Sequence, residues 1–177
     1  MKHFFLRSSL DTGMGLLVLV ATICVLTTCR SSVTTSLIDG FVSYQSVQDV
    51  RNQIAAAGLG SAWTEEQNWV DPNDRRSRHD FITLSGKFRH LGQDGSLKLT
   101  FFNDRLMETD FSVSNGDSYL TALRVQVKGI PTVAKHEVEI SHHTKVVYYV
   151  DVNGGIRCVW KDANLDREWM KWVRDNT

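Results

Sequence analysis

The chain has 177 residues with 20 basic and 20 acidic side chains, so its formal net charge is zero. Hydrophobic residues make up 42% of it and charged residues 23%, which is typical of a folded globular protein and excludes a largely disordered one. Binding to nucleic acid requires a concentrated basic face on the protein. The balanced charge therefore argues against nucleic acid as a partner, and the length suits one domain plus a targeting segment.

The first 29 residues have the pattern of an export signal. Lys2 and Arg7 form a short basic region, and residues 12–29 contain no charged side chain. This uncharged stretch has 18 residues, which is the lower limit for a segment that crosses a bilayer. We therefore expect residues 1–29 to direct export, either as a removable signal or as a membrane anchor.

A cysteine ends this segment. Cys29 follows Leu26, Thr27 and Thr28, and this ending resembles the lipobox of bacterial lipoproteins. The resemblance implies that Cys29 is lipidated and becomes the mature N-terminus, followed by a polar tether over residues 30–42. Two alternatives stay open, which are an uncleaved anchor helix and a signal that is removed to leave a soluble protein.

Residues 43–57 are expected to form the first helix of a single domain over residues 43–177. Val47, Val50 and Ile54 recur at helical spacing and form one apolar stripe. A serine followed three residues later by an aspartate, at positions 46 and 49, has the pattern of a capping box at the start of a helix.

Alternation of apolar and polar residues predicts strands along most of the remaining chain. It is clearest over residues 81–90, where Ile82, Leu84 and Phe88 are expected to share one face. The other strands are expected over residues 63–70, 97–101, 107–113, 133–141, 144–152 and 156–160. In the strand expected over residues 107–113, Met107 is expected to share a face with Phe111.

Two further helices are expected, a short one over residues 115–124 and a closing one from about Leu165. Leu165, Trp169 and Trp172 form an apolar stripe in the closing helix. We therefore predict an α+β fold, with an antiparallel sheet of about five to seven strands and an N-terminal and a C-terminal helix packed on it.

Residue types with catalytic or metal-binding chemistry are present without a diagnostic spacing. His136, His142 and His143 are interpreted as surface or hairpin histidines. Glu108 and Asp110 share one face of a strand and could act as acid and base, but a solvated face is the favoured interpretation. The sequence has neither a phosphate-binding loop nor a nucleophile elbow. We therefore expect no catalytic residue, no cofactor and no metal site.

Cysteine and tryptophan complete the candidate residues. Cys158 is the only cysteine after position 29, and we expect it to be buried and unreactive. The chain has five tryptophans, most of which we expect in the core. Trp63, Trp69 and Trp172 are the candidates for anchors of a protein partner.

Two further stretches extend the resemblance to small bacterial envelope lipoproteins. They are residues 95–107, GSLKLTFFNDRLM, and residues 159–162, VWKD, which precede the helix with two tryptophans. A helix followed by a sheet is also similar to the small lipoproteins of the outer-membrane assembly machinery and to the β-lactamase-inhibitor-protein-like fold. The resemblance implies a domain that faces the periplasm, and it implies no activity and no catalytic residue.

The expected function is therefore that of an exported, membrane-tethered and non-enzymatic lipoprotein that presents a protein-interaction surface in the cell envelope. Its partners would be the membrane, through the N-terminal segment, and an unidentified protein. The alternative is a periplasmic ligand-binding module with an aromatic-lined pocket between the sheet and the helices. The inner and the outer membrane remain equally open as locations.

Overall fold

The computed structural model describes residues 34–60, 63–68, 81–127, 135–141, 143–150 and 154–177. The chain divides into two compact units, residues 1–31 and residues 32–177, and every described residue belongs to the second unit. The expected export segment, with Cys29, lies outside the described residues, as does the N-terminal part of the expected tether.

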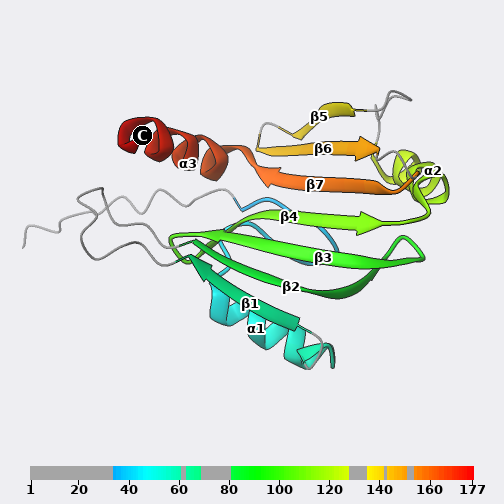
Figure 1. Cartoon of the computed structure of the whole chain (residues 1–177), viewed down its shortest axis with the longest axis horizontal. Helices are drawn as coiled ribbons and strands as arrows, with labels where there is room; N and C mark the ends of the chain where they lie inside the picture. The colour runs from blue at the N-terminus through cyan, green and yellow to red at the C-terminus, as the bar shows by residue number, and fades with distance from the viewer. Residues whose placement is uncertain (1–33, 61–62, 69–80, 128–134, 142, 151–153) are drawn as a thin grey trace, which may run out of the picture. The chain divides into compact units, whose positions relative to one another are not determined.

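The second unit contains one antiparallel sheet of seven strands. The strands are β1 (Trp63–Asn68), β2 (Phe81–His90), β3 (Gln93–Phe102), β4 (Arg105–Val113), β5 (Lys135–Ser141), β6 (Thr144–Val150) and β7 (Ile156–Asp162). Their order across the sheet is β1-β2-β3-β4-β7-β6-β5, so the last strand in sequence lies beside the fourth (Figure 1). Together with three helices, this sheet confirms the predicted α+β fold.

The helices are α1 (Val47–Ala56), α2 (Gly116–Gln126) and α3 (Ala163–Asn176). The predicted capping box at Ser46 and Asp49 is complete, so α1 begins at Val47 and not at residue 43, where the expected range 43–57 began. Val50 and Ile54 of its apolar stripe are buried, with 0% and 4% of their surface exposed. Asn115 caps α2, and Asp162 caps α3.

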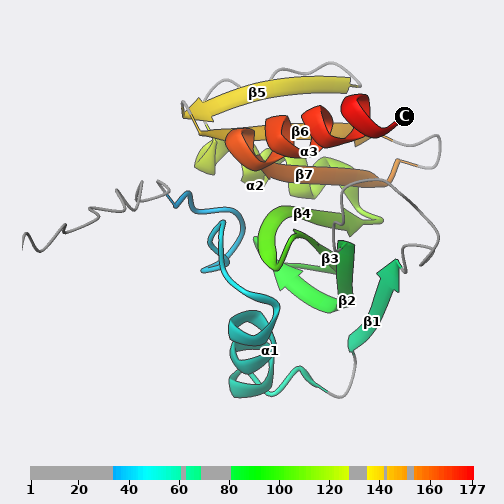
Figure 2. The ribbon, with the colours of Figure 1, turned by 90° about the vertical axis from the view of Figure 1, so that its left-hand side faces the viewer.

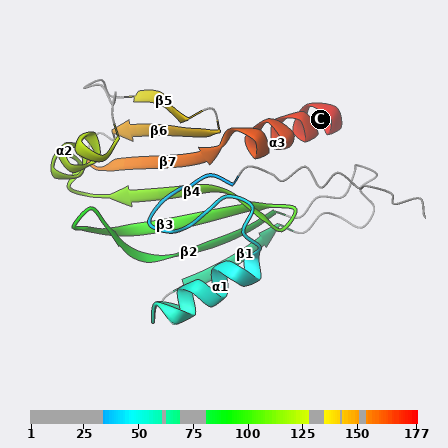
Figure 3. The ribbon, with the colours of Figure 1, turned by 180° about the vertical axis from the view of Figure 1, so that it is seen from behind.

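The main core lies on one face of the sheet. The strands contribute Leu84, Leu97, Leu99, Phe101, Leu106, Phe111, Val113, Val146, Tyr148, Ile156, Cys158 and Trp160 to it. α1 and α2 cover this face, and so does the segment before α1, which crosses β3 and β4 in the view from behind (Figure 3). Each fully buried leucine or phenylalanine contributes about 1.5–3 kcal/mol to folding.

The segment before α1 corrects one expectation. We expected a polar tether over residues 30–42, but Leu37, Ile38 and Phe41 are buried in the main core. Thr35 closes the segment into a loop, because its backbone N–H donates to the Ser43 side chain while its carbonyl accepts from the Ser43 N–H, both at 2.9 Å. Three apolar side chains within five residues are enough to hold this loop on the sheet, so the folded domain includes residues 34–42.

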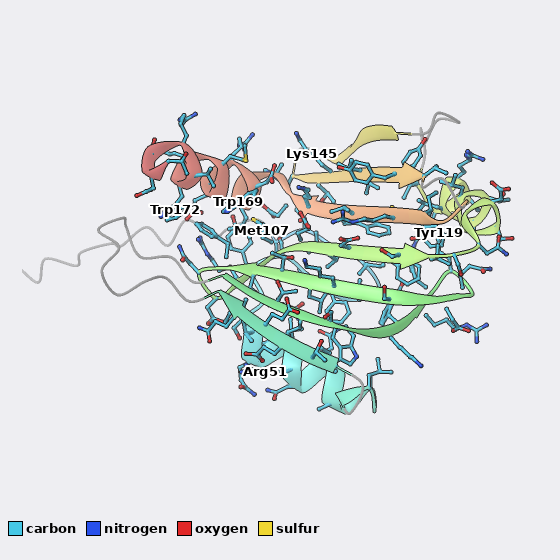
Figure 4. All side chains as sticks on the ribbon, viewed as in Figure 1. Arg51, Met107, Tyr119, Lys145, Trp169 and Trp172 are labelled. Atoms are coloured by element: carbon cyan, nitrogen blue, oxygen red, sulfur yellow. The ribbon has the colours of Figure 1, made fainter. Side chains whose placement is uncertain are left out.

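α3 is held by a second, smaller cluster. Phe102, Met107 and Leu165 form this cluster, against which Trp169 and Trp172 pack. α3 lies beyond the end of β6 and β7 in Figure 1, so it is in front of these strands in Figure 2, and its two tryptophans lie near Met107 at one end of the sheet in Figure 4. The helix therefore extends from the end of the sheet instead of covering the main core.

Met107 does not share a face with Phe111, as we had expected. The pairing of β3 with β4 shifts between Thr100 and Phe101, which are opposite Glu108 and Leu106. Met107 is the extra residue of this β-bulge, so the alternation of faces is interrupted there. As a result, Leu106 points into the main core and Met107 into the cluster under α3.

Candidate functional site

A cavity of about 660 Å³ opens on the core side of the sheet. It is lined by residues 34–40, by Gln126 and Val127 at the end of α2, by His143 and Thr144 at the start of β6, and by His90 and Trp160. The segment that carries residues 34–40 is the one that crosses β3 and β4 in Figure 3. The volume of the cavity is in the range of about 300–1,000 Å³ that small-molecule sites occupy.

His90 is the most buried titratable side chain of this lining, with 2% of its surface exposed. It is the last residue of β2, just before the turn at Leu91 and Gly92, which have φ angles of 50° and 77°. The imidazole lies against two aromatic rings of other strands. Its ring centroid lies 5.6 Å from that of Phe111 and 5.5 Å from that of Trp160.

A glycine permits a close approach of the hairpin between β2 and β3 to β4. A Cβ at Gly95 would lie 2.3 Å from the carbonyl oxygen of Ser112 and 2.7 Å from the Phe111 ring. Only a residue without a side chain fits so close to β4. Gly95 therefore lets the hairpin approach the part of the core that contains Phe111 and His90.

The two ring nitrogens of His90 have different neighbours. Nδ1 forms a hydrogen bond of 2.9 Å with the Tyr119 hydroxyl. Nε2 lies 3.7 Å from Oδ1 of Asp39. The second distance is too long for a direct hydrogen bond. A hydroxyl oxygen about 2.8 Å from both atoms would bridge Nε2 and Oδ1, so the pair can bind a polar group of a ligand.

Burial lowers the pKa of His90 from its ordinary value of 6.5, and the nearby Asp39 carboxylate opposes part of this shift. The imidazole is therefore neutral near pH 7, with one nitrogen that donates and one that accepts. Since Nδ1 is bonded to Tyr119, Nε2 offers a single hydrogen bond toward the cavity, whose direction depends on the tautomer.

The buried side chains of Tyr119 and Cys158 lie in the core near His90. Burial is the main cause that raises the pKa of both side chains. Cys158 has 0% of its surface exposed, which confirms its expected burial. A thiol held in its protonated form is a poor nucleophile, so this group holds the imidazole in place and offers no covalent chemistry.

A buried carboxylate connects the cavity to α3. Asp162, at 0% exposed, accepts hydrogen bonds from the backbone N–H groups of Asn164 and Leu165 at 2.9 and 3.0 Å. Its other oxygen accepts from the hydroxyl of Thr35, at 3.2 Å. The backbone N–H of Ala163 donates to the carbonyl of His143 at 2.8 Å, so the cavity wall and the start of α3 form one hydrogen-bonded unit.

The structure places Glu108 and Asp110 outside the cavity. We had favoured a solvated face for them, but each is paired with a basic side chain. Asp110 is only 5% exposed, and its Oδ2 lies 2.6 Å from Nη2 of Arg157. Glu108 pairs with Lys161 at 3.0 Å. Both cations come from β7, which pairs with β4, and this neighbour cannot be read from the local sequence.

Of the three predicted histidines, only His143 can be placed. It lines the cavity, and its Nδ1 lies 3.1 Å from the side-chain nitrogen of Asn164. The His136 side chain and His142 lie outside the part of the structure that is described. No group of three or more His, Cys, Asp or Glu side chains that could hold a metal ion occurs among the described residues.

His90 was missed in the sequence, although a signal for it exists. It has the same parity as Ile82, Leu84 and Phe88, so the alternation of β2 already places it on the core face. A histidine at an inward position of a strand requires a polar partner, and here the partners are Tyr119 and Asp39.

The candidate interaction tryptophans are engaged in apolar packing where they can be placed. Trp63 is partly buried and lies over Gly86, where a Cβ would be 2.6 Å from its ring. Trp172 is partly buried against the cluster under α3. Trp69 lies outside the described residues. A role of these tryptophans in binding a partner stays a prediction.

A comparison of the chain with known protein families, with curated proteins and with solved structures finds no match. Within the described ranges, no helix is both long and apolar enough to span a bilayer. The candidate site therefore rests on the geometry of its own residues.

Proposed function

We propose that this chain is an exported, membrane-tethered binding protein of the bacterial cell envelope. In this proposal, Cys29 carries the lipid, the domain faces the periplasm, and a small polar ligand binds in the cavity at His90. The first two points rest on the sequence of residues 1–29. The third rests on the contacts of His90 and favours the ligand-binding alternative over an interaction surface.

One observation carries the binding role, which is the position of Nε2 of His90. It faces the Asp39 carboxylate across 3.7 Å, inside a cavity that Thr34, Thr35 and Thr144 also line. A ligand hydroxyl or amide group that bridges Nε2 of His90 and Oδ1 of Asp39 would give both atoms a partner, so this arrangement favours a polar ligand. The raised pKa of Cys158 supports a non-enzymatic role, since it leaves no activated nucleophile beside His90 among the described residues.

A panel of envelope compounds tests the binding role. The full chain, in detergent micelles, is heated with sugars, lipid headgroups or peptidoglycan fragments, and a true ligand raises its melting temperature. We expect Asp39→Asn to weaken the best compound at least tenfold, because the bridging carboxylate is lost. Asp94→Asn is the matched control, since Asp94 is exposed and does not line the cavity.

Two results would count against the binding role. One is a panel in which no compound stabilises the chain. The other is a compound that binds the Asp39→Asn variant and the Asp94→Asn variant equally well, because its site would then lie elsewhere.

The intact mass of the protein recovered from its membrane tests the tether separately. A mass that begins at Cys29 with added acyl chains is expected. A mass equal to the whole chain would replace the lipid with an uncleaved anchor, and it would leave the binding role untouched.

A protein partner that docks on α3 is the second candidate function. It is favoured by Met170, which is 53% exposed beside the partly buried Trp169 and Trp172. A photo-cross-linking residue at position 170 should then capture one protein in intact cells. The same residue at exposed position 51 on α1 is the control, and equal capture from both positions would argue against docking on α3.

A further inference from the structure

Part of the sheet face opposite the main core is polar, and its side chains form rows across the strands; the face also has the buried Val147 and Val159 on β6 and β7. One row contains Lys87, Ser96, Ser112, Arg157 and Tyr149, which pair in this order through β2, β3, β4, β7 and β6. The adjacent row contains Thr64, Ser85, Lys98 and Asp110, from β1 to β4. The face is the one toward the viewer in Figure 1, where α1 lies behind the sheet.

Two hollows lie side by side on this face. One, of about 490 Å³, is lined by Tyr149 and Arg157, and the other, of about 480 Å³, by Lys87, Lys98 and Asp110. Ser112 lines both, so the two hollows adjoin at this residue, and the pair is referred to as the groove. From β2 to β6 the groove covers four strand spacings of about 4.8 Å, roughly 19 Å, which suits a short oligomer better than a single small molecule.

Asp110 is the first reason to expect a ligand in this groove. Arg157 holds its Oδ2, with Nε at 2.7 Å and Nη2 at 2.6 Å. Its Oδ1 is buried and has no hydrogen-bond donor among the described residues. A buried carboxylate oxygen without a donor is energetically costly, because it has lost water and gained nothing. A hydroxyl group of a ligand would supply the missing donor.

The charge of the lining is the second reason. Lys87 and Lys98 are exposed, and neither forms an ion pair with a described residue. Together with Arg157 they are three cations against the single carboxylate of Asp110. This excess of positive charge favours an anionic ligand. The carboxylate is already neutralised by Arg157, so it does not repel such a ligand.

An aromatic ring is the third reason. Tyr149 is 36% exposed, and the guanidinium of Arg157 lies 5.9 Å from its ring centroid. An exposed aromatic ring can stack on the apolar C–H face of a sugar. Serine and threonine hydroxyls lie along the rest of the groove at Thr64, Ser85 and Ser96 and can exchange hydrogen bonds with sugar hydroxyls.

From these features we infer that the polar face binds an acidic oligosaccharide. Its carboxylates pair with Lys87 and Lys98, a hydroxyl donates to Oδ1 of Asp110, and a ring stacks on Tyr149. The groove lies on the opposite side of the sheet from the cavity at His90. The inference is therefore independent of the proposed ligand site and stands even if the cavity binds nothing.

Calorimetric titration of the full chain in detergent micelles tests this inference. The probes are tetragalacturonate, its fully methyl-esterified form and a polyaspartate of equal charge. We expect tetragalacturonate to bind saturably, the ester at least tenfold more weakly, and polyaspartate more weakly as well, because it has no sugar ring to stack on Tyr149.

Variants locate the binding. K87Q and K98Q are each expected to weaken tetragalacturonate several-fold, and Y149A to weaken the acid and the ester alike. K171Q, which changes an exposed lysine on α3, is the matched control and should bind as the wild type does. Far-ultraviolet circular dichroism confirms that each variant is folded before it is titrated.

Three results would overturn the inference. They are the absence of saturable tetragalacturonate binding, equal binding of the polyaspartate, and equal loss of binding in K98Q and K171Q. The first result removes the site, the second reduces it to general charge attraction, and the third places it away from the groove.

Discussion

Acidification is expected to destabilise the domain through His90. Burial lowers the pKa of His90 in the folded domain, whereas the unfolded chain titrates near 6.5. Above pH 6.5 the side chain is neutral in both states. Below it the unfolded chain takes up a proton that the folded domain excludes, so the free energy of unfolding falls as the pH falls toward the lowered pKa.

The groups that face His90 set the size of this effect. The Asp39 carboxylate opposes the shift, while Tyr119 stays neutral because burial raises its pKa, and the other ring neighbours are Phe111 and Trp160. One excluded proton gives a slope of at most about 1.4 kcal/mol per pH unit. Removing the charge in Asp39→Asn should lower the pKa of His90 further and widen the pH range over which stability is lost.

Urea unfolding monitored by tryptophan fluorescence, in half-unit steps from pH 7.5 to pH 5.0, measures this slope. The wild type should lose stability with falling pH more steeply than His90→Asn, in which the titrating group is absent. Asp39→Asn provides a second comparison if His90→Asn folds poorly, because Asp39 is on the surface. Parallel stability curves for all three proteins would refute the assignment of a lowered pKa to His90.

Two further substitutions test the packing around the site, both by urea unfolding at pH 7.5. Asp162→Ala should cost about 1–2 kcal/mol, since it removes the cap of α3 and the bond from Thr35, while Asp162→Asn should cost less. Equal losses in the two variants would show that the cap contributes little. Thr109→Val should be neutral or stabilising by up to about 1 kcal/mol, because the buried Oγ1 of Thr109 has no hydrogen-bond partner among the described residues. A loss larger than about 1 kcal/mol would indicate that this hydroxyl has a partner.

The local elements of the fold could be predicted because their patterns are local. The capping box at Ser46 and the alternation over residues 81–90 each occupy one continuous segment, and the structure has a helix and a strand there. The position of β7 beside β4 could not be predicted, because a pairing between distant segments leaves no periodic signal in either of them.

The wrong predictions for residues 34–42 and for Asp110 have related causes. The loop over residues 34–42 has neither helical nor strand periodicity, so its buried side chains Leu37, Ile38 and Phe41 resembled scattered residues of a tether. Asp110 was expected to be solvated because its partner Arg157 belongs to β7. In both cases a contact between distant segments decides burial, and the sequence records only the residue types.

The candidate site was predictable in part. The parity of β2 places His90 on the core face, so the sequence contained a sign of a buried histidine. Its partners could not be identified, since Asp39 comes from the loop before α1 and Tyr119 from α2. A tertiary site made from three elements becomes visible only when the elements are placed together.

The most direct test of the account is a nuclear magnetic resonance spectrum of the chain labelled with ¹⁵N at histidine. It is recorded with and without the panel compound that stabilises the chain most, and the His90 signals are assigned by their absence in His90→Asn. The account predicts that the compound moves the Nε2 signal of His90 while the ring stays neutral. A stabilising compound that leaves both nitrogen signals of His90 unchanged would contradict it.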